Sequence, residues 1–233
     1  MHPAVPVVLS YVSGSIPAAY LAGKWSGVDL RAHGSGNLGA TNVLRILGPR
    51  IGMAVFALDI AKGALPVRFL PPLTGATGDQ LTWIAVACGV AAILGHIRPV
   101  FLGFGKGGKG VATACGVFIA LAPLQAVLSL LIFVVVLMSS GYVSLASLTA
   151  AISLPVLLGA SVGARSPLFY VSLVTTLFVF WTHRENIERL RANTEYRFGR
   201  AANFGRRPSM AIGIALLVLA AAFLAASVGG RRG

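Results

Sequence analysis

The sequence predicts an all-α integral membrane protein that consists mainly of one multi-spanning membrane domain. Of its 233 residues, 56% are hydrophobic and only 11% are charged, whereas soluble globular chains carry about 25% charged residues. Three long stretches, 3–23, 110–164 and 208–230, contain no Asp, Glu, Lys or Arg. At about 20 residues for each spanning helix, the apolar segments leave room for seven or eight crossings. This composition excludes disorder, a coiled coil and an ordinary soluble domain.

The first half of the chain contains three candidate spanning helices. The first run, 4–23, is preceded by His2 but by no Lys or Arg, and it is long enough to cross a bilayer. It is therefore a first helix rather than a signal peptide. A polar, glycine-rich segment separates it from the second run. The second and third helices are predicted at 51–67 and 80–95.

The longest uncharged stretch and its continuation to residue 182 must be divided by turn residues. Pro123, Gly141 and the segment 165–167 are the strongest turn signals. They predict four helices, the first of which is short for a membrane crossing. A further apolar run follows a polar segment and precedes two terminal arginines. These five predicted helices are 111–122, 124–140, 143–163, 168–181 and 209–228.

The basic residues are unevenly distributed between the two sides of the predicted bundle. When loops alternate between the sides, one side receives four, three and seven Lys and Arg residues in segments 24–50, 96–110 and 183–207. The other side receives only four. The positive-inside rule makes the basic side cytoplasmic and places the N-terminus outside.

The net charge of +13 would suggest a nucleic-acid partner in a soluble protein. Here the basic residues lie in short segments between apolar runs, which suits orientation in a bilayer and attraction of anionic lipid or of a phosphorylated substrate. No nucleic acid is expected as a partner. Cys88 and Cys115 lie inside apolar runs, where we expect them to pack rather than to form a disulfide or a metal site.

The first polar segment contains GSGNLGATN at 34–42, followed by Arg45. The glycine spacing matches a dinucleotide-binding loop, but no strand precedes it and the acidic residue at the expected distance lies in an apolar helix. Glycines let backbone N–H groups face an anion, and a helix over 38–47 would add its positive end. The alternative is a flexible loop in which the glycines only make turns. The candidate phosphate-binding residues are Gly34, Ser35, Gly36, Asn37, Gly39, Thr41, Asn42 and Arg45, and the helix would place the last three on one face.

The second polar segment contains GKGGKG at 105–110, directly before a predicted helix. It differs from a Walker A loop because Gly110 stands where a Ser or Thr would bind the metal ion, so ATP hydrolysis is not expected. Two lysines among four glycines at a helix start favour an anion through backbone donors, the helix dipole and point charge. A purely orienting role in the membrane would explain the lysines but not the glycines. The candidate residues are Lys106, Gly107, Gly108, Lys109 and Gly110.

The third polar segment contains HRENIERLR at 183–191. As a helix, it would place Arg184, Glu188 and Arg191 on one face, and its apolar face could rest at the membrane interface and hold polar groups against a site. An ordinary charged interfacial helix is the alternative. The face directed at the site would carry His183, Asn186, Ile187 and Leu190.

Three further residues lie within or beside the apolar runs. Ser144 stands at a predicted inner turn, where it either faces a substrate or bonds to the preceding turn of its own helix. Asp59 and Lys62 are three residues apart in an apolar run, so we expect them to pair and to support a site from within the membrane.

The three segments GSGNLGATN, GKGGKGVAT and HRENIERL, in this order in a membrane chain, resemble the acyl-phosphate-dependent glycerol-3-phosphate acyltransferases, the family commonly called PlsY. The resemblance covers about residues 13–197. It implies a compact bundle of seven transmembrane helices in the bacterial cytoplasmic (inner) membrane, with the active site on the cytoplasmic side. The run 209–228 is an addition to these seven helices. The implied organisation is an acyltransferase membrane domain at 1–208 and an extra hydrophobic helix with a basic tail at 209–233.

The resemblance also implies the reaction. A fatty acyl group passes from acyl phosphate to the 1-hydroxyl of sn-glycerol 3-phosphate, which gives lysophosphatidic acid and phosphate in the first acylation step of phospholipid synthesis. The implied partners are both substrates, membrane lipid and the enzyme that produces acyl phosphate; no cofactor or metal is implied. A transporter or flippase for an organic phosphate or an anionic lipid is the alternative, but the sequence shows no internal repeat of the kind common in transporters.

The resemblance assigns roles residue by residue. Segments 35–42 and 106–110, with Arg45, would hold phosphate groups, and Ser144, His183 and Asn186 would orient glycerol 3-phosphate. Because acyl phosphate already has a good leaving group, we expect direct attack by the substrate hydroxyl, and no Ser/His/Asp nucleophile arrangement is evident. No H-x-x-x-x-D motif is present either. The expected catalytic residues are Ser35, Arg45, Lys109 and His183.

Overall fold

The computed structural model describes residues 1–197, which form helices and turns without a strand. The predicted helix at 209–228 lies outside the described residues. The chain divides into two compact units, Met1–Leu121 (unit 1) and Ala122–Gly233 (unit 2). The second unit is described as far as residue 197.

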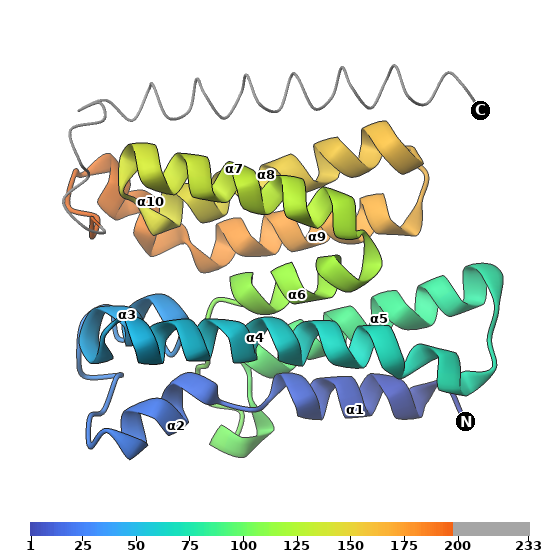
Figure 1. Ribbon diagram of the computed structural model, residues 1–233, viewed down its shortest axis with the longest axis horizontal. Helices are drawn as coiled ribbons and strands as arrows, with labels where there is room; N and C mark the ends of the chain where they lie inside the picture. The colour runs from blue at the N-terminus through green and yellow to red at the C-terminus, as the bar shows by residue number, and fades with distance from the viewer. Residues whose placement is uncertain (198–233) are drawn as a thin grey trace. The chain divides into compact units, whose positions relative to one another are not determined.

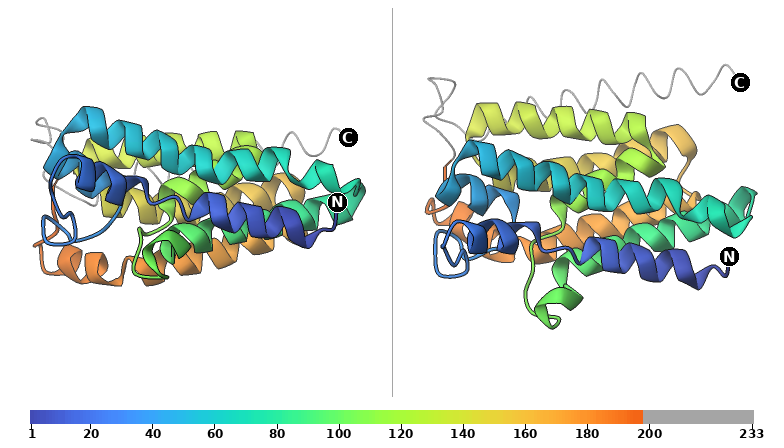
Figure 2. Two further views of the ribbon diagram at one scale, coloured as in Figure 1. Left: turned by 90° about the horizontal axis from the view of Figure 1, so that it is seen from below. Right: turned by 60° about the horizontal axis from the view of Figure 1, so that its bottom comes forward.

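Unit 1 contains six α-helices and two short 3₁₀ turns (Figure 1). The long helix α4 packs along α6 and α3, and α1 packs along α5. In both views of Figure 2, the α1 helix lies alongside the long axis of α4. The elements are α1 (Ala4–Gly14), α2 (Ala18–Trp25), α3 (Ala40–Leu47), α4 (Pro49–Phe69), η1 (Pro71–Thr74), α5 (Gly78–Ile97), η2 (Val100–Leu102) and α6 (Val111–Leu121).

The helices of unit 1 approach one another at glycines, as is usual for helices packed in a membrane. A Cβ atom on Gly116 of α6 would collide with the Ile60 carbonyl of α4. In the same helix pair, Gly63 of α4 lies against the carbonyl of Thr113 of α6. Gly14 and Gly95 bring α1 and α5 together in the same way. Backbones this close leave the positions of α4, α5 and α6 little freedom.

The first predicted helix is wrong in one respect, because it is broken in the middle. Helix α1 ends at Gly14 and α2 begins at Ala18. Pro17 has no N–H to donate, and the residue before a proline avoids the helical conformation, so Ile16 cannot continue the turn. The carbonyl of Ile16 is instead bonded by the side chain of Lys62, with Nζ at 2.8 Å. The prediction missed this break because it rested on the absence of charged residues and did not use Pro17 as a break signal.

The described part of unit 2, residues 122–197, contains four helices, of which α8 packs against both α7 and α9. The predicted turn signals are confirmed, because Pro123 and Pro167 begin helices and Gly141, with φ 76°, ends one. Polar side chains join the helices, as in the bond from Ser153 Oγ to Ser129 Oγ at 2.9 Å. The elements are α7 (Pro123–Ser140), α8 (Val143–Val162), α9 (Pro167–Thr182) and α10 (Arg184–Arg191).

Four described segments are long and apolar enough to span a membrane: Ala4–Trp25, which includes the break, Gly78–Leu102, Pro123–Ser140 and Val143–Val162. Two shorter apolar helices are Val111–Leu121 and Pro167–Thr182. Helix α4 has 21 residues and carries Asp59 and Lys62 in its interior. For the apolar helices between residues 50 and 182, the predicted bounds agree with the structure to within two residues.

Candidate active site

The first glycine-rich segment is folded around the buried side chain of Asn42. Its Oδ1 accepts a bond from the backbone N–H of Ser35 at 3.0 Å, and its Nδ2 donates to the carbonyls of Leu30 and His33, each at 3.1 Å. Helix α3 begins at Ala40, two residues later than predicted. Thr41, Asn42 and Arg45 all lie within this helix, but the Asn42 amide bonds to the loop and shapes it, so it supports the loop rather than a ligand.

Two glycines in this loop have positive φ values, Gly34 at 62° and Gly36 at 67°. A Cβ atom on Gly34 would also collide with the Asn42 amide oxygen. These glycines are therefore required by the path of the chain. The loop leaves Ser35 and Arg45 exposed, with Thr41 and Gly39 half-buried. These glycines and the bonds to Asn42 give the loop a specific shape, which favours a structured loop over the alternative of a flexible one.

The second glycine-rich segment is attached to the end of α5. The N–H of Gly107 donates to the Ile97 carbonyl at 2.9 Å, and the N–H of Gly108 donates to the His96 carbonyl at 3.3 Å. These bonds satisfy carbonyls that the end of a helix leaves without partners. The sequence predicted that the glycine N–H groups would face an anion, and for these two residues that prediction is wrong.

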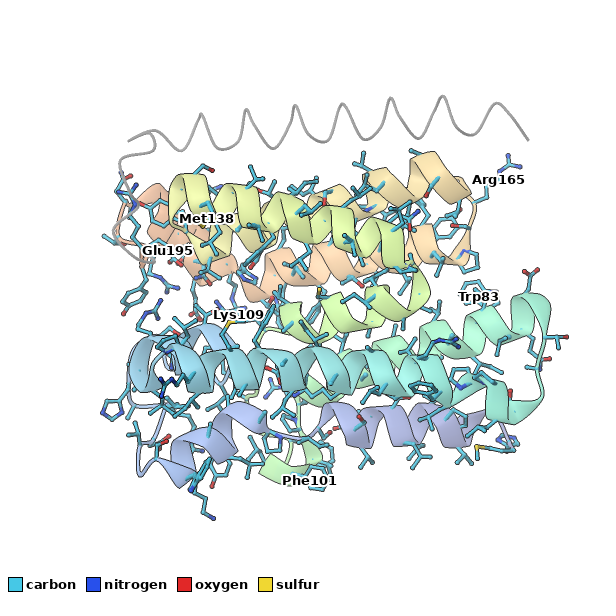
Figure 3. The ribbon with its side chains drawn as sticks, in the orientation of Figure 1. Trp83, Phe101, Lys109, Met138, Arg165 and Glu195 are labelled. Carbon is cyan, nitrogen blue, oxygen red and sulfur yellow. The ribbon has the colours of Figure 1, made fainter. Side chains whose placement is uncertain are left out.

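The donors that remain at this loop lie at the start of α6. The first N–H groups of a helix have no partner within the helix, and the helix dipole favours an anion there. Lys106 is exposed and Lys109 is half-buried, and Figure 3 marks Lys109 where α6 starts. Gly110, with φ 81°, makes the turn into α6. The loop therefore presents two cations beside a helix N-terminus.

Gly108 brings the two glycine-rich segments of unit 1 together. A Cβ atom at this position would collide with the His96 imidazole and would lie 2.9 Å from the carbonyl oxygen of Leu38. Leu38 stands in the first motif, so the two loops are in contact through this glycine. A larger residue at 108 would force the loops apart.

A buried charge cluster lies beneath these loops. Lys62 Nζ is 2.8 Å from Asp59 Oδ1, which confirms the predicted pair. His96 Nδ1 is 3.6 Å from the same oxygen. All three side chains are buried, and with Gly107 and Gly108 they line a small cavity. Among residues 1–197, no group of three or more His, Cys, Asp or Glu side chains is arranged to hold a metal ion.

The third motif lies in unit 2, where α9 ends and α10 begins. His183 is buried, and its Nδ1 lies 2.8 Å from the Val179 carbonyl. A carbonyl can only accept, so Nδ1 carries the proton and Nε2 of the neutral ring carries the lone pair. The predicted helix faces are confirmed, since His183 and Asn186 are buried while Arg184 and Glu188 are exposed.

Glu195 joins the third motif, although the sequence did not single it out. Its side chain accepts a bond from Asn186 Nδ2 at 2.6 Å and another from Arg189 Nε at 2.7 Å. Burial disfavours the charged form of Glu195, but these bonds and the nearby Ser144 hydroxyl outweigh it and lower the pKa of the carboxyl below its usual range. Figure 3 shows Glu195 at the Met138 end of unit 2, opposite Arg165.

Ser144 is buried at the start of α8 and lies beside Glu195. Its hydroxyl lies beside the Glu195 carboxylate, whose pKa it helps to lower, and makes no hydrogen bond to its own helix. The alternative in which it bonds to its own helix is therefore excluded. Ser144, Asn186 and Glu195 come together at one end of unit 2.

We expect Glu195→Gln to lower the thermal unfolding midpoint, because the ion pair with Arg189 is lost. The cost is about 1–2 kcal/mol, in the lower part of the range for charge-assisted bonds because Arg189 is partly exposed. Since the folded-state pKa is depressed, this stability is present above the ordinary value of 4.5 and is lost as the pH falls through the folded-state value. Unfolding curves at neutral and acidic pH measure this. A difference that persists unchanged in acid would contradict it, and Glu188→Gln, on the exposed face of α10, is the matched control.

A family model described as glycerol-3-phosphate acyltransferase matches residues 4–193 of the chain. The chain belongs to the glycerol-3-phosphate acyltransferase family. A relative of that name from Synechococcus sp. (strain CC9902) is 48% identical over 194 residues, which cover 83% of this chain and 94% of the relative. Another, from Geobacter metallireducens, is 53% identical over 189 residues, which cover 81% of this chain and 94% of the relative. The resemblance inferred from the three motifs is confirmed, and the protein is an acyltransferase.

Solved structures of this acyltransferase family agree with the fold. The crystal structure of PlsY (YgiH), an integral membrane glycerol 3-phosphate acyltransferase, in its glycerol 3-phosphate form, has a TM-score of 0.78 and 42% sequence identity. The match covers 85% of this chain and 96% of that one. The lysophosphatidic acid form has a TM-score of 0.74 and 41% identity. The chain is therefore a multi-pass membrane protein.

Two residues of this acyltransferase went unnoticed in the sequence. His96, the first residue of the polar segment 96–110, lies in the last turn of α5 and faces Asp59. The sequence signal for this role is weak: a histidine at the edge of an apolar run, in a chain that also has an acid–base pair inside another apolar run. Glu195 had no local signal, because its partners Asn186 and Arg189 are brought to it by the turn after α10.

Proposed function

We propose that this protein transfers a fatty acyl group from acyl phosphate to the 1-hydroxyl of sn-glycerol 3-phosphate, giving lysophosphatidic acid and phosphate. The observation that carries the proposal is the match to PlsY structures in glycerol 3-phosphate and lysophosphatidic acid forms, over 85% of this chain. These two molecules are the acceptor and the product of one acylation. A covalent acyl-enzyme is not required, because acyl phosphate has a good leaving group.

The reaction proceeds by direct attack of the substrate hydroxyl on the acyl carbon. A new C–O ester bond forms, the bond between the acyl carbon and the phosphate oxygen breaks, and phosphate departs with the electron pair. The hydroxyl proton passes to His183 Nε2, which is the acceptor atom of the neutral ring because Nδ1 donates to Val179. A phosphate oxygen of the bound substrate is the alternative proton acceptor.

The cations and donors of the two glycine-rich loops position the phosphate groups and stabilise the oxyanion that develops in the transition state. Arg45 and Ser35 are exposed on the first loop. Lys109 lies beside the start of α6. Ser144 and Asn186 orient glycerol 3-phosphate, and Glu195 holds the Asn186 amide. The second loop contributes Lys106 and Gly110, while Gly107 and Gly108 fix its position.

We further propose that the protein lies in the bacterial cytoplasmic membrane with seven transmembrane helices in its acyltransferase domain, 1–208, and the extra hydrophobic segment 209–233 after it. Fourteen of the 19 basic residues fall in the three polar segments on one side, which supports a cytoplasmic site. The enzyme that produces acyl phosphate is a proposed partner, because it supplies the acyl donor.

The test is turnover in detergent micelles, without any sealed compartment. Purified protein with labelled glycerol 3-phosphate and palmitoyl phosphate should release lysophosphatidic acid and phosphate in equal amounts. A transporter or flippase would make neither product in micelles. In a second assay, with the protein reconstituted into sealed vesicles, it would move the label across the membrane. Transport without product formation would overturn the proposal.

A further inference from the structure

The charges within α4 need an explanation that the reaction does not supply. Asp59 and Lys62 are buried in the middle of a membrane helix, where ionised groups are costly. A pair of apolar side chains would serve stability as well or better. Ionisable groups inside membrane helices usually support function, and these two line a cavity together with Gly107 and Gly108 of the second loop.

The pair connects two distant structural features. Lys62 donates to the Ile16 carbonyl at the break between α1 and α2. Asp59 neutralises Lys62 and also faces His96 at the end of α5. The break in the first helix is thus joined to the last turn of α5 through two charged side chains.

His96 is the member of the cluster that contacts the second loop. Its carbonyl accepts the N–H of Gly108, and its imidazole occupies the space that a Cβ atom on the same glycine would need. A small cavity lies beside this contact, lined by His96, Asp59, Lys62 and the two glycines. The imidazole therefore determines how deeply Gly108 sits, and with it where Lys109 and the start of α6 lie.

We propose that His96, held by the buried Asp59–Lys62 pair, is a positioning residue that sets the second glycine-rich loop for phosphate binding. The inference rests on the proposed function, which assigns this loop to a phosphate group. His96 acts through the loop and does not touch the reacting atoms. Its side chain lies between Asp59 of α4 and Gly108 of the loop, so the position of the loop depends on the position of α4.

The test compares His96→Gln with the unchanged protein in steady-state turnover. Because the loop can sink toward the cavity in the variant, we expect the KM of one phosphorylated substrate to rise by about ten-fold while kcat changes less than about three-fold. Asp59→Asn should raise the same KM. The double variant should raise it no more than the single variant with the larger effect, because the two residues act as one unit. If Asp59→Asn does not fold, the KM of His96→Gln alone tests the inference, because that variant keeps the ion pair of Asp59 and Lys62.

A merely structural role would give a different result. Ser153→Ala removes a buried hydrogen bond of unit 2 and is the control, expected to lower the unfolding midpoint with both KM values unchanged. If His96→Gln behaves like this control, the inference is overturned.

Binding of inorganic phosphate separates the inference from the proposed function. Phosphate should raise the unfolding midpoint of the unchanged protein, and His96→Gln should need about ten times more of it for the same rise. If the unchanged protein makes no lysophosphatidic acid but this difference is found, the function fails and the positioning role stands. If turnover is normal and His96→Gln shows neither effect, only the positioning role fails.

Discussion

Replacing His183 by Asn is expected to lower kcat by about 10²- to 10⁴-fold, the range that general acid–base catalysis usually contributes. The bond from Nδ1 to the Val179 carbonyl leaves Nε2 as the atom that accepts a proton. Asn keeps a polar side chain but offers no basic nitrogen. The measurement is kcat as a function of pH, in which the unchanged enzyme should lose rate in acid, where the imidazole is protonated, and the variant should lose this dependence.

The control for this variant is His2→Asn, which changes an exposed histidine outside the site and should leave kcat and its pH dependence intact. A His183→Asn enzyme that keeps the original pH profile and most of its rate would contradict the general-base role. The hydroxyl proton would then pass to a phosphate oxygen of the substrate.

Replacing Lys109 by Ala is expected to lower kcat/KM by about 10- to 100-fold. A charge-assisted bond to phosphate contributes about 1.5–3 kcal/mol, which corresponds to this range. Lys109 is half-buried next to the first turn of α6, where its charge and the helix dipole favour the same anion. Steady-state kinetics with each substrate varied in turn measure the loss and show which phosphate the lysine holds.

Lys24→Ala is the matched control, because Lys24 is an exposed lysine of α2 outside the three motifs. It should leave kcat/KM unchanged. If Lys109→Ala turns over normally, the second loop does not hold a phosphate through this residue, and the assignment of roles to the loop must be abandoned.

The helices were predictable because their signals are local. Charge-free runs marked the apolar helices, and Pro123, Gly141 and Pro167 marked turns that act through their own backbone. The pair of Asp59 and Lys62 was predictable for the same reason, since a spacing of three residues in a helix brings side chains together.

The rest of the site depends on contacts that the chain makes at long range. Asn42 bonds to residues up to 12 positions away, and the pattern of its helix could not show that its amide turns inward. The glycines at 107 and 108 appeared to be anion-binding donors, but the end of α5 uses their N–H groups. Glu195 is placed by a turn without a recognisable motif.

The most direct test of the central claim is the choice of acyl donor. Purified protein is given glycerol 3-phosphate with palmitoyl phosphate, palmitoyl-CoA or palmitoyl-carrier protein, and lysophosphatidic acid is measured. We expect product from palmitoyl phosphate alone, because the proposed mechanism uses the phosphate both as the leaving group and as the handle that the loops bind. Equal product from the thioesters, or no product from any donor, would contradict this account.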